Sequence, residues 1–261
     1  MEIDKQINRE IGVHGQQWNA MHEGYFSNSI IARPLIATIS KYLSDSNTDV
    51  LVDLGGGTGF ILLELIARGV IQNMVPVNLD YSAMQLDAME KRGISCINCL
   101  ISDFSRSNLA TLDKRISFIM RSVLHYFGKD GLIPVLGHIR KQAKTGEMFI
   151  HQTACFESEI EAQCINVLYR EMGTPKWYPT INELRESMSI TSWQVIDICS
   201  APPLKLSSVE LGVRYGLDSQ TLAKVCSRVM EEFGEINNVF QRGPDGFVAY
   251  LHYRICAAKA A

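Results

Sequence analysis

Short apolar runs alternate with longer amphipathic stretches between residues 50 and 154. A short apolar run bounded by turn residues is typical of a buried strand, whereas apolar residues spaced three and four apart are typical of a helix. The runs predict strands at 50–54, 75–80, 96–102, 116–122 and 147–154. The amphipathic stretches predict helices at 59–69, 82–92, 105–113 and 129–143.

This alternation predicts the fold class. Strands that alternate with helices at such spacing build βαβ units, in which helices cover both faces of a parallel sheet. We therefore expect an α/β protein with a doubly wound, mostly parallel sheet. Ligands of such sheets bind beyond the carboxyl ends of the strands, so functional residues should be sought there.

The first 29 residues are polar and carry aromatic side chains at helical spacing, among them Trp18, Tyr25 and Phe26. A short amphipathic helix is expected there, and a second helix over 33–43. Two interpretations are open for residues 1–29. The segment is either a lid that excludes water from a ligand, with Trp18 and Tyr25 facing the substrate, or a face that packs on the main domain, which we place at 30–261.

The main domain carries a first helical insertion at about 157–188. Its pattern predicts a helix over 157–171, a turn, and a second helix that begins with a capping box at Thr180. Trp177 and Tyr178 lie between the two helices. They are candidates for the wall of a substrate pocket, and ordinary helix packing is the alternative.

A second insertion is expected at 203–244. Apolar residues keep helical spacing there over about five turns, at Leu222, Val225, Val229, Phe233, Ile236 and Phe240. So long an apolar stripe must be buried. It either covers the substrate side of the domain or forms the contact of a homodimer.

A glycine-rich turn follows the first predicted strand. Residues 50–59 read VLVDLGGGTG, and a helix is expected directly afterwards. Glycines let the backbone turn sharply and let a bound molecule approach the main chain closely. The N-terminus of the following helix offers unpaired N–H groups and a partial positive charge. This turn is therefore the main candidate for a ligand site.

Acidic residues end the next two predicted strands. Asp80 ends the second strand, and Asp103 ends the third beside Phe104. A carboxylate at the position of Asp80 can accept two hydrogen bonds from a ribose diol. An acid with a neighbouring ring, such as Asp103 with Phe104, can bind an exocyclic amine and stack on a purine. Each acid alone could equally cap a helix, but the two together favour a nucleoside ligand.

Composition and charge restrict the partners. The chain has 261 residues, of which 46% are hydrophobic and 20% charged, with a net charge of −3. No long Lys/Arg cluster gives an electrostatic reason to expect nucleic acid or an anionic membrane surface. The start lacks the apolar core of a signal peptide, and no stretch reaches the roughly 18 apolar residues of a membrane span. A cytoplasmic location is expected.

The seven cysteines fit reduced and mostly buried thiols, because they are odd in number and scattered among apolar neighbours. Cys96 and Cys99 form a Cys-x-x-Cys pair within a predicted strand. Residues three apart in a strand point to opposite faces, so this pair is not expected to share a metal ion.

The glycine spacing separates two classes of nucleotide-binding fold. The dinucleotide fingerprint Gly-x-Gly-x-x-Gly needs a glycine at its sixth position, where Phe60 stands. Together, the stretches VDLGGGTGF (52–60), NLDYSAMQL (78–86) and ISDF (101–104) closely resemble the class I, Rossmann-like superfamily of S-adenosylmethionine-dependent methyltransferases. The resemblance covers roughly residues 30–155 well and the remainder in outline.

The resemblance implies S-adenosylmethionine as cofactor and a seven-stranded sheet with an antiparallel last strand. Residues 193–198 and 246–253 would form the closing antiparallel hairpin. In this superfamily the residues that match Gly55, Gly57 and Gly59 contact the amino acid part of the cofactor. The residue that matches Asp53 helps to hold the loop and the cofactor ammonium.

Further roles follow from the same resemblance. Asp80 would bind the ribose and Tyr81 would flank the adenine, while Asp103 and Phe104 would frame the edge and face of the adenine. The segment 121–126 resembles the segment that borders the methyl group. It assigns Arg121 to the cofactor and Tyr126 to the substrate. The chain departs from the family in two ways: residues 116–119 lack the acid often found in the fourth strand, and Arg121 stands where a small or polar residue is common.

The predicted reaction is in-line transfer of a methyl group to a small-molecule acceptor, with oxygen or nitrogen as the acceptor atom. Alignment and exclusion of water are the main tasks of such a protein. A base is needed only where the acceptor is protonated. His125 follows the fourth strand and His151 lies within the fifth, so each is a candidate base, with a hydrogen-bonded place in the pocket wall as the alternative.

Two other functions remain open from the sequence. An NAD-dependent oxidoreductase would share the strand, turn and helix and the ribose acid, but it would need the other glycine spacing. A non-catalytic module that binds S-adenosylmethionine or its demethylated product would use the same cofactor residues. Histidines and aromatic residues near the methyl-facing end favour an enzyme.

Overall fold

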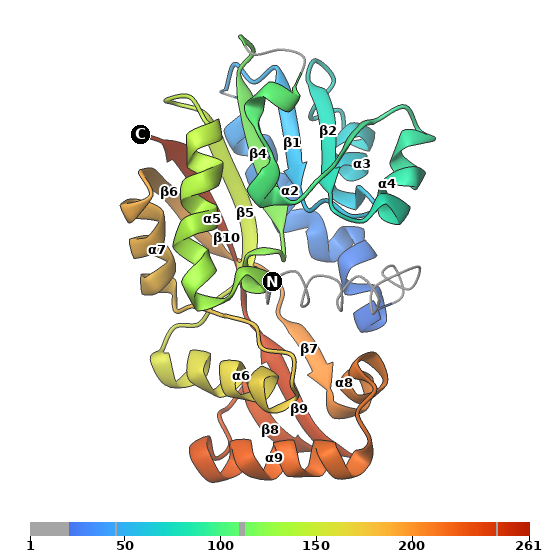
Figure 1. Ribbon diagram of the computed structural model, residues 1–261, viewed down its shortest axis with the longest axis vertical. Coiled ribbons are helices and arrows are strands. Elements are labelled where there is room, and N and C mark those ends of the chain that lie inside the picture. Colours follow the sequence, from blue (N-terminus) through green and yellow to red (C-terminus); the bar gives the residue numbers. More distant parts are fainter. Residues whose placement is uncertain (1–20, 45, 110–112, 244) are drawn as a thin grey trace.

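The computed structural model describes residues 21–261 apart from 45, 110–112 and 244. Its main element is a seven-stranded sheet in the order β3-β2-β1-β4-β5-β10-β6 (Figure 1). The strands of this sheet are β1 (Val50–Leu54), β2 (Val75–Asp80), β3 (Ser95–Asn98), β4 (Ile116–Arg121), β5 (Met148–Ala154), β6 (Trp193–Ser200) and β10 (Tyr253–Ala260).

The sheet is parallel except for one strand. β1 pairs in parallel with both β2 and β4, and β10 runs antiparallel between β5 and β6. All five residues of β1 are buried because it lies in the middle of the sheet. The predicted α/β fold with a mostly parallel sheet and an antiparallel last strand is confirmed.

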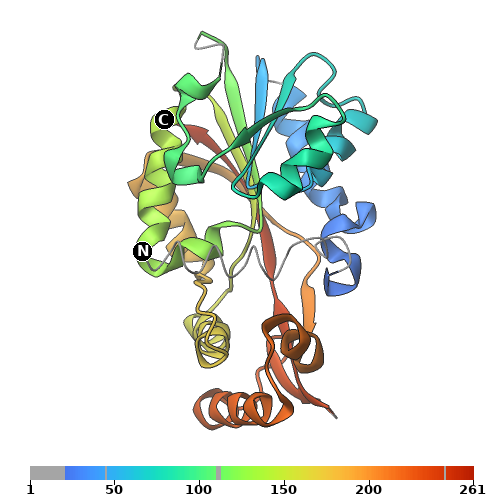
Figure 2. The same ribbon diagram turned by 45° about the vertical axis from the view of Figure 1, so that its right-hand side comes forward.

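Helices cover both faces of the sheet (Figure 2). Leu51 of β1 packs on one face with the helices α2 (Ser29–Ser44) and α3 (Phe60–Ala67). Its neighbour Val52 packs on the other face with α5 (Gly128–Gln142) and α7 (Ile181–Ile190). The period-two alternation of a strand thus supplies both halves of the core. The helix α4 (Ala83–Glu90) follows β2 and buries Met89 beside α3.

The last strand differs from the prediction. Residues 246–253 were expected to form the seventh strand of the main sheet, and this placement is wrong. Gly246–Leu251 is a strand, β9, but it belongs to a separate three-stranded sheet in the order β7-β9-β8. The seventh strand of the main sheet is Tyr253–Ala260, in which only Lys259 is exposed. Its run of small alanines lacks the β-branched residues that mark a strand in sequence, and pairing on both edges provides the stabilisation instead.

The helix expected within 203–244 forms, but it is shorter than the predicted apolar stripe. The stretch folds into β7 (Leu204–Ser207), α8 (Ser208–Tyr215), α9 (Ser219–Phe233) and β8 (Phe240–Gly243). α9 ends at Phe233 because Gly234 follows with φ 68°, a left-handed value that terminates a helix. Ile236 and Phe240 therefore lie beyond the helix, joined by an isolated bridge.

These elements and α6 (Glu159–Glu171) form a small lobe beside the carboxyl ends of the main sheet (Figure 1). α6 packs on α9, and α9 packs on β9. Val225 and Val229 of the predicted apolar stripe are buried in this lobe. The stripe is thus covered within one chain, and it gives no reason to expect a second copy.

Short 3-10 helices replace some expected elements. The third strand was expected at 96–102 but ends at Asn98, four residues earlier, and η3 (Ile101–Asp103) follows. Only η4 (Arg106–Asn108) forms within the expected helix 105–113, whose residues 110–112 lie outside the described ones. At the other end of the chain, η2 (Met21–Ser27) precedes α2.

Within the described part of the chain, none of the helices combines the length and the apolar character needed to cross a membrane.

Candidate functional site

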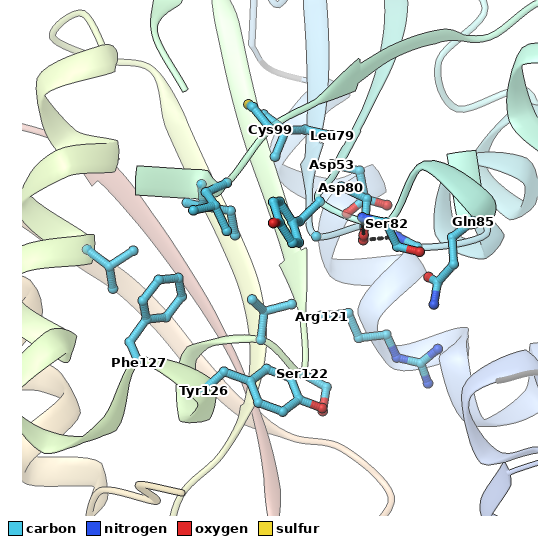
Figure 3. A pocket seen from close by; sticks show the side chains of 18 of the residues that line it. Asp53, Leu79, Asp80, Ser82, Gln85, Cys99, Arg121, Ser122, Tyr126 and Phe127 are labelled. Carbon is cyan, nitrogen blue, oxygen red and sulfur yellow. Dashed lines mark hydrogen bonds between the residues drawn. The ribbon is translucent and has the colours of Figure 1, made fainter. Parts of the chain in front are cut away.

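A cavity of about 380 Å³ lies at the carboxyl ends of β1, β2 and β4 (Figure 3). The glycine turn after β1, the residues after β2 and β3, and the segment 121–127 line it. Phe26 of η2 and one side of α5 complete the wall. The cavity therefore lies beyond the carboxyl ends of the strands, where doubly wound sheets bind their ligands.

The glycine turn needs glycine for two reasons. Gly55, Gly57 and Gly59 have φ values of 71°, 54° and 72°, in the left-handed region that side chains disfavour. Gly56 is required by space, because a Cβ there would lie 2.1 Å from Oδ1 of Asn78. Gly55, Gly56 and Gly57 line the cavity, whereas Gly59 lies behind it at the N-terminus of α3, against Met89.

Asp80 ties the glycine turn to the end of β2. Its carboxylate accepts a hydrogen bond from the backbone N–H of Gly57 at 2.9 Å and from that of Ser82 at 2.8 Å. Burial raises the pKa of the carboxyl, while these backbone N–H groups oppose the shift. Each carboxylate oxygen keeps a second lone pair, so Asp80 can still accept bonds from a ligand in the cavity.

Asp53 places a buried carboxylate in the cavity wall. It is 2% exposed, and its Oδ2 accepts no hydrogen bond from any described residue. Burial and the neighbouring Asp80 raise the pKa of Asp53 to about 7, although the Arg121 guanidinium opposes the shift. A buried carboxylate without a partner is costly, so this position suits a ligand that brings a positive charge.

The predicted adenine residues divide into two groups. Tyr81 is 44% exposed and lines the cavity. Asp103 is exposed and Phe104 is buried against Phe118, and neither lines the cavity. Because η3 turns the chain after β3, the residues just before Asp103 take their place in the wall, and these are Cys99, Leu100, Ile101 and Ser102.

Arg121 joins the cavity to the N-terminal segment. Its Nη1 donates a hydrogen bond to the carbonyl oxygen of Phe26 at 2.9 Å, and its guanidinium lies 5.3 Å from the centre of that ring. Phe26 lines the cavity. Tyr25 instead points away, donating its hydroxyl to the carbonyl oxygen of Pro202 and stacking on Tyr253. Of the predicted lid residues, Trp18 lies outside the described residues.

The candidate base His125 lies one residue away from the cavity lining. It is buried in η5 (Leu124–Phe127), with its ring 4.0 Å from that of Tyr126 and 5.3 Å from that of Tyr178. Tyr126 lines the cavity, as expected for a substrate residue. Tyr178 is buried, Trp177 packs beside α5, and neither lines the cavity. Their positions fit ordinary helix packing, the alternative to a substrate-pocket wall.

His151 lies in the interior of the sheet. It is 0% exposed, its ring stacks on Phe149 at 4.8 Å, and neither ring nitrogen bonds to a described residue. Burial lowers its pKa to about 3, so the imidazole is neutral. Because a ring enclosed in this way cannot exchange a proton with a molecule in the cavity, the structure argues against the predicted catalytic role of His151.

Several lining residues were missed from the sequence. Gly56, Cys99, Ser122 and His138 all line the cavity. His138 lies on α5, with Nε2 2.8 Å from the carbonyl oxygen of Phe104. In the sequence, His138 directly precedes Ile139 of the apolar helical stripe. A polar residue in that place is ordinary for an amphipathic helix, so nothing there indicated a ligand site.

The fold matches solved structures. The YcgJ protein of Bacillus subtilis superimposes with a TM-score of 0.62 at 12% identity, over 87% of this chain and 97% of that one. The 1,6-didemethyltoxoflavin-N1-methyltransferase of Burkholderia thailandensis, solved with its substrate and S-adenosylhomocysteine, gives 0.58 at 14% identity, over 100% and 89%. The geranyl diphosphate C-methyltransferase of Streptomyces coelicolor gives 0.50 at 16% identity, over 88% and 80%.

The sequence matches no protein-family model and no curated protein. At identities of 12% to 16%, the structural likeness establishes the fold. This chain therefore has the Rossmann-like fold of these methyltransferases, as the resemblance of its motifs predicted.

Proposed function

We propose that the protein is an S-adenosylmethionine-dependent methyltransferase that acts on oxygen or nitrogen of a small molecule. One observation carries the proposal: the buried carboxylate of Asp53 lines the cavity beside the glycine turn with an oxygen that no described residue satisfies. The amino acid part of S-adenosylmethionine would bring an ammonium group to that position. The fold shared with solved methyltransferases supports the same assignment.

The same observation weighs against an NAD-dependent oxidoreductase. In dinucleotide folds the glycine turn receives a pyrophosphate. A carboxylate at Asp53 would repel that anion, whereas it attracts an ammonium group. Phe60, where the fingerprint needs its last glycine, agrees with this distinction.

The residues of the cavity fit the remaining parts of the cofactor. Gly55 and Gly57 leave bare backbone for the amino acid part, Asp80 keeps lone pairs for the ribose, and Tyr81 offers a ring to the adenine. When bound, S-adenosylmethionine supplies a methyl group already activated by its sulfonium. The contribution of the chain is then to align the acceptor and to exclude water.

Aromatic side chains support an enzyme over a binding module. Phe26, Phe60 and Tyr126 line the cavity with apolar surface, which suits a site that must exclude water. His125 stays a proposed base for protonated acceptors, acting beside Tyr126, because its ring contacts that of Tyr126. Residues 1–29, of which the structure describes 21–29, stay a proposed lid, since Arg121 holds Phe26 at the cavity.

Calorimetry would test the cofactor. We expect the protein to bind S-adenosylmethionine and S-adenosylhomocysteine and to show no detectable binding of NAD. Preferential binding of NAD would contradict the proposal. A screen with radiolabelled S-adenosylmethionine over small phenols, amines and carboxylic acids would test catalysis. Cofactor binding with no labelled product from the whole screen would favour the non-catalytic module.

A further inference from the structure

Two buried hydroxyl groups form a pair at the edge of the cavity. Ser122 follows β4 and Tyr253 begins β10, and their exposed fractions are 4% and 1%. Their oxygens lie 2.6 Å apart, which is a short hydrogen-bonding distance for two hydroxyls. Ser122 lines the cavity and Tyr253 does not.

The direction of this hydrogen bond follows from burial. The pair holds two hydroxyl hydrogens, and one of them is used between the two oxygens. If Ser122 donated, the hydrogen of Tyr253 would be left in the core, and an unsatisfied buried donor is destabilising. Tyr253 therefore donates to Ser122. The hydrogen of Ser122 stays available to a molecule in the cavity.

The backbone of Ser122 is held in an unfavourable conformation. Its φ is 61°, a left-handed value that is unfavourable for a residue other than glycine. Its N–H donates to the carbonyl oxygen of Gln152 on β5 at 2.8 Å. Strain at a residue that lines a cavity is a sign of a functional constraint. Here the left-handed backbone and its hydrogen bond to Gln152 fix the position of the Ser122 hydroxyl near β5 and β10.

The strand order places this hydroxyl away from the cofactor residues. The glycine turn and Asp80 lie on β1 and β2, on one side of β4. Tyr253, toward which the Ser122 side chain reaches, lies on β10, two strands away on the other side. The ring of Phe26, which lines the cavity, lies edge-on 6.5 Å from that of Tyr253. The hydroxyl thus faces a part of the cavity that also has an aromatic wall.

We infer that Ser122 binds the methyl acceptor, donating a hydrogen bond to an oxygen or nitrogen of a planar aromatic molecule such as a phenol. The ring of the acceptor packs on Phe26, and Tyr253 orients the Ser122 hydroxyl. This inference rests on the proposed methyltransferase function. An aromatic ring suits the site because ring pairs attract each other beyond what their buried area alone contributes.

The test uses 4-nitrophenol as the probe, titrated into the protein saturated with S-adenosylhomocysteine. We expect Ser122→Gly to weaken 4-nitrophenol binding by about three- to tenfold, the loss typical of one hydrogen bond. The affinity for S-adenosylhomocysteine itself should stay within about twofold of the wild type. Tyr253→Phe should weaken the probe less, because Ser122 then keeps its hydroxyl and loses only its orientation.

Ser122→Ala is the matched variant, since it removes the hydroxyl and keeps the left-handed strain, whereas Ser122→Gly relieves it. Equal losses in the two variants support the hydroxyl as the cause. A loss confined to Ser122→Gly, with wild-type binding in Ser122→Ala, would assign the effect to the backbone and overturn the inference. Wild-type protein that binds S-adenosylmethionine and not 4-nitrophenol would also overturn it. Failure to bind S-adenosylmethionine would instead refute the proposed function.

Discussion

Asn78 donates a hydrogen bond from its side-chain Nδ2 to the carbonyl oxygen of Gly57 at 2.9 Å. Asn78 lies on β2 in register with Asp53 of β1, so the neighbouring strand fixes the glycine turn. Its Oδ1 fills the space where Gly56 lacks a side chain. The shape of the turn thus depends on contacts across two strands, in addition to the freedom of glycine.

Gly56→Ala should damage this turn. The added Cβ would lie 2.1 Å from Oδ1 of Asn78 and 2.7 Å from Asp53, so the turn must shift. Overpacking of this kind costs about 1–3 kcal/mol. We expect a lower melting temperature and loss of S-adenosylmethionine binding by calorimetry.

Gly137→Ala is the control for this variant. Gly137 lies within α5, and its added Cβ would meet only Thr191 at an ordinary 3.6 Å. It should be neutral or stabilising by up to about 1 kcal/mol, because alanine favours a helix over glycine. Wild-type cofactor affinity in Gly56→Ala would contradict the role assigned to the turn.

The sequence was sufficient to predict the parallel part of the sheet and the position of the cavity. Alternating apolar runs and helical stripes are local patterns, and the glycine turn stands directly between two of them. The sequence did not indicate the role of Gly56, because the residue it must avoid, Asn78, is brought close only by pairing of β1 with β2. Ser122 was missed for the same reason, since its partner Tyr253 is distant in sequence.

Local patterns also misplaced some residues. The apolar spacing of Ile236 and Phe240 continued that of α9, but the left-handed Gly234 ends the helix before them. Asp103 and Phe104 matched a family motif in sequence, yet η3 turns one outward and the other into the core. A periodic pattern predicts which residues are buried, but it does not predict which element they pack against.

Asp53 should make the stability of the ligand-free protein depend on pH. The pKa of its carboxyl in the folded state, about 7, lies above the ordinary value of 3.8. The folded protein therefore holds a proton that the unfolded chain loses. This contribution to stability is present below pH 4 and is lost as the pH rises toward about 7. In Asp53→Asn, stability should not fall with rising pH for this reason. Melting temperatures of both proteins at pH 4 to 8 would show the difference.

Cofactor binding should have the opposite pH dependence. An ammonium group prefers the ionised carboxylate, so affinity for S-adenosylmethionine should rise between pH 5 and 7, by at most about tenfold per unit. Calorimetry with Asp53→Asn should show weaker binding that changes little over this range. Equal affinities of wild type and variant at pH 7 would remove Asp53 from the cofactor site.

The buried ion pair between Arg106 and Glu147 should be important for folding. The Glu147 carboxylate accepts hydrogen bonds from Arg106 at 2.7 and 2.8 Å and from the backbone N–H groups of Ile116 and Lys144 at 2.8 Å. Glu147→Ala removes all four and leaves the Arg106 guanidinium, which is 12% exposed, without its carboxylate partner. Loss of one partner of a buried pair costs about 3–5 kcal/mol, which urea unfolding would measure.

Asp87→Ala is the control for this pair. It removes the ion pair with Lys91, whose side chain is exposed directly after α4. Exposed pairs contribute about 0–1 kcal/mol. A loss in Glu147→Ala no larger than that of Asp87→Ala would show that the buried pair is not stabilising.

Arg121→Lys should loosen η2 while the main sheet stays intact. Arg121 donates to the carbonyl oxygens of Phe26 and Tyr25 at 2.9 and 3.5 Å, and a lysine lacks the planar fork that reaches both. Amide hydrogen exchange should therefore quicken over residues 21–27 and stay unchanged in β4. Arg68→Lys, which alters an exposed pair with Glu64, should leave both regions as in the wild type. Unchanged exchange of residues 21–27 in Arg121→Lys would show that other contacts hold η2 on the cavity.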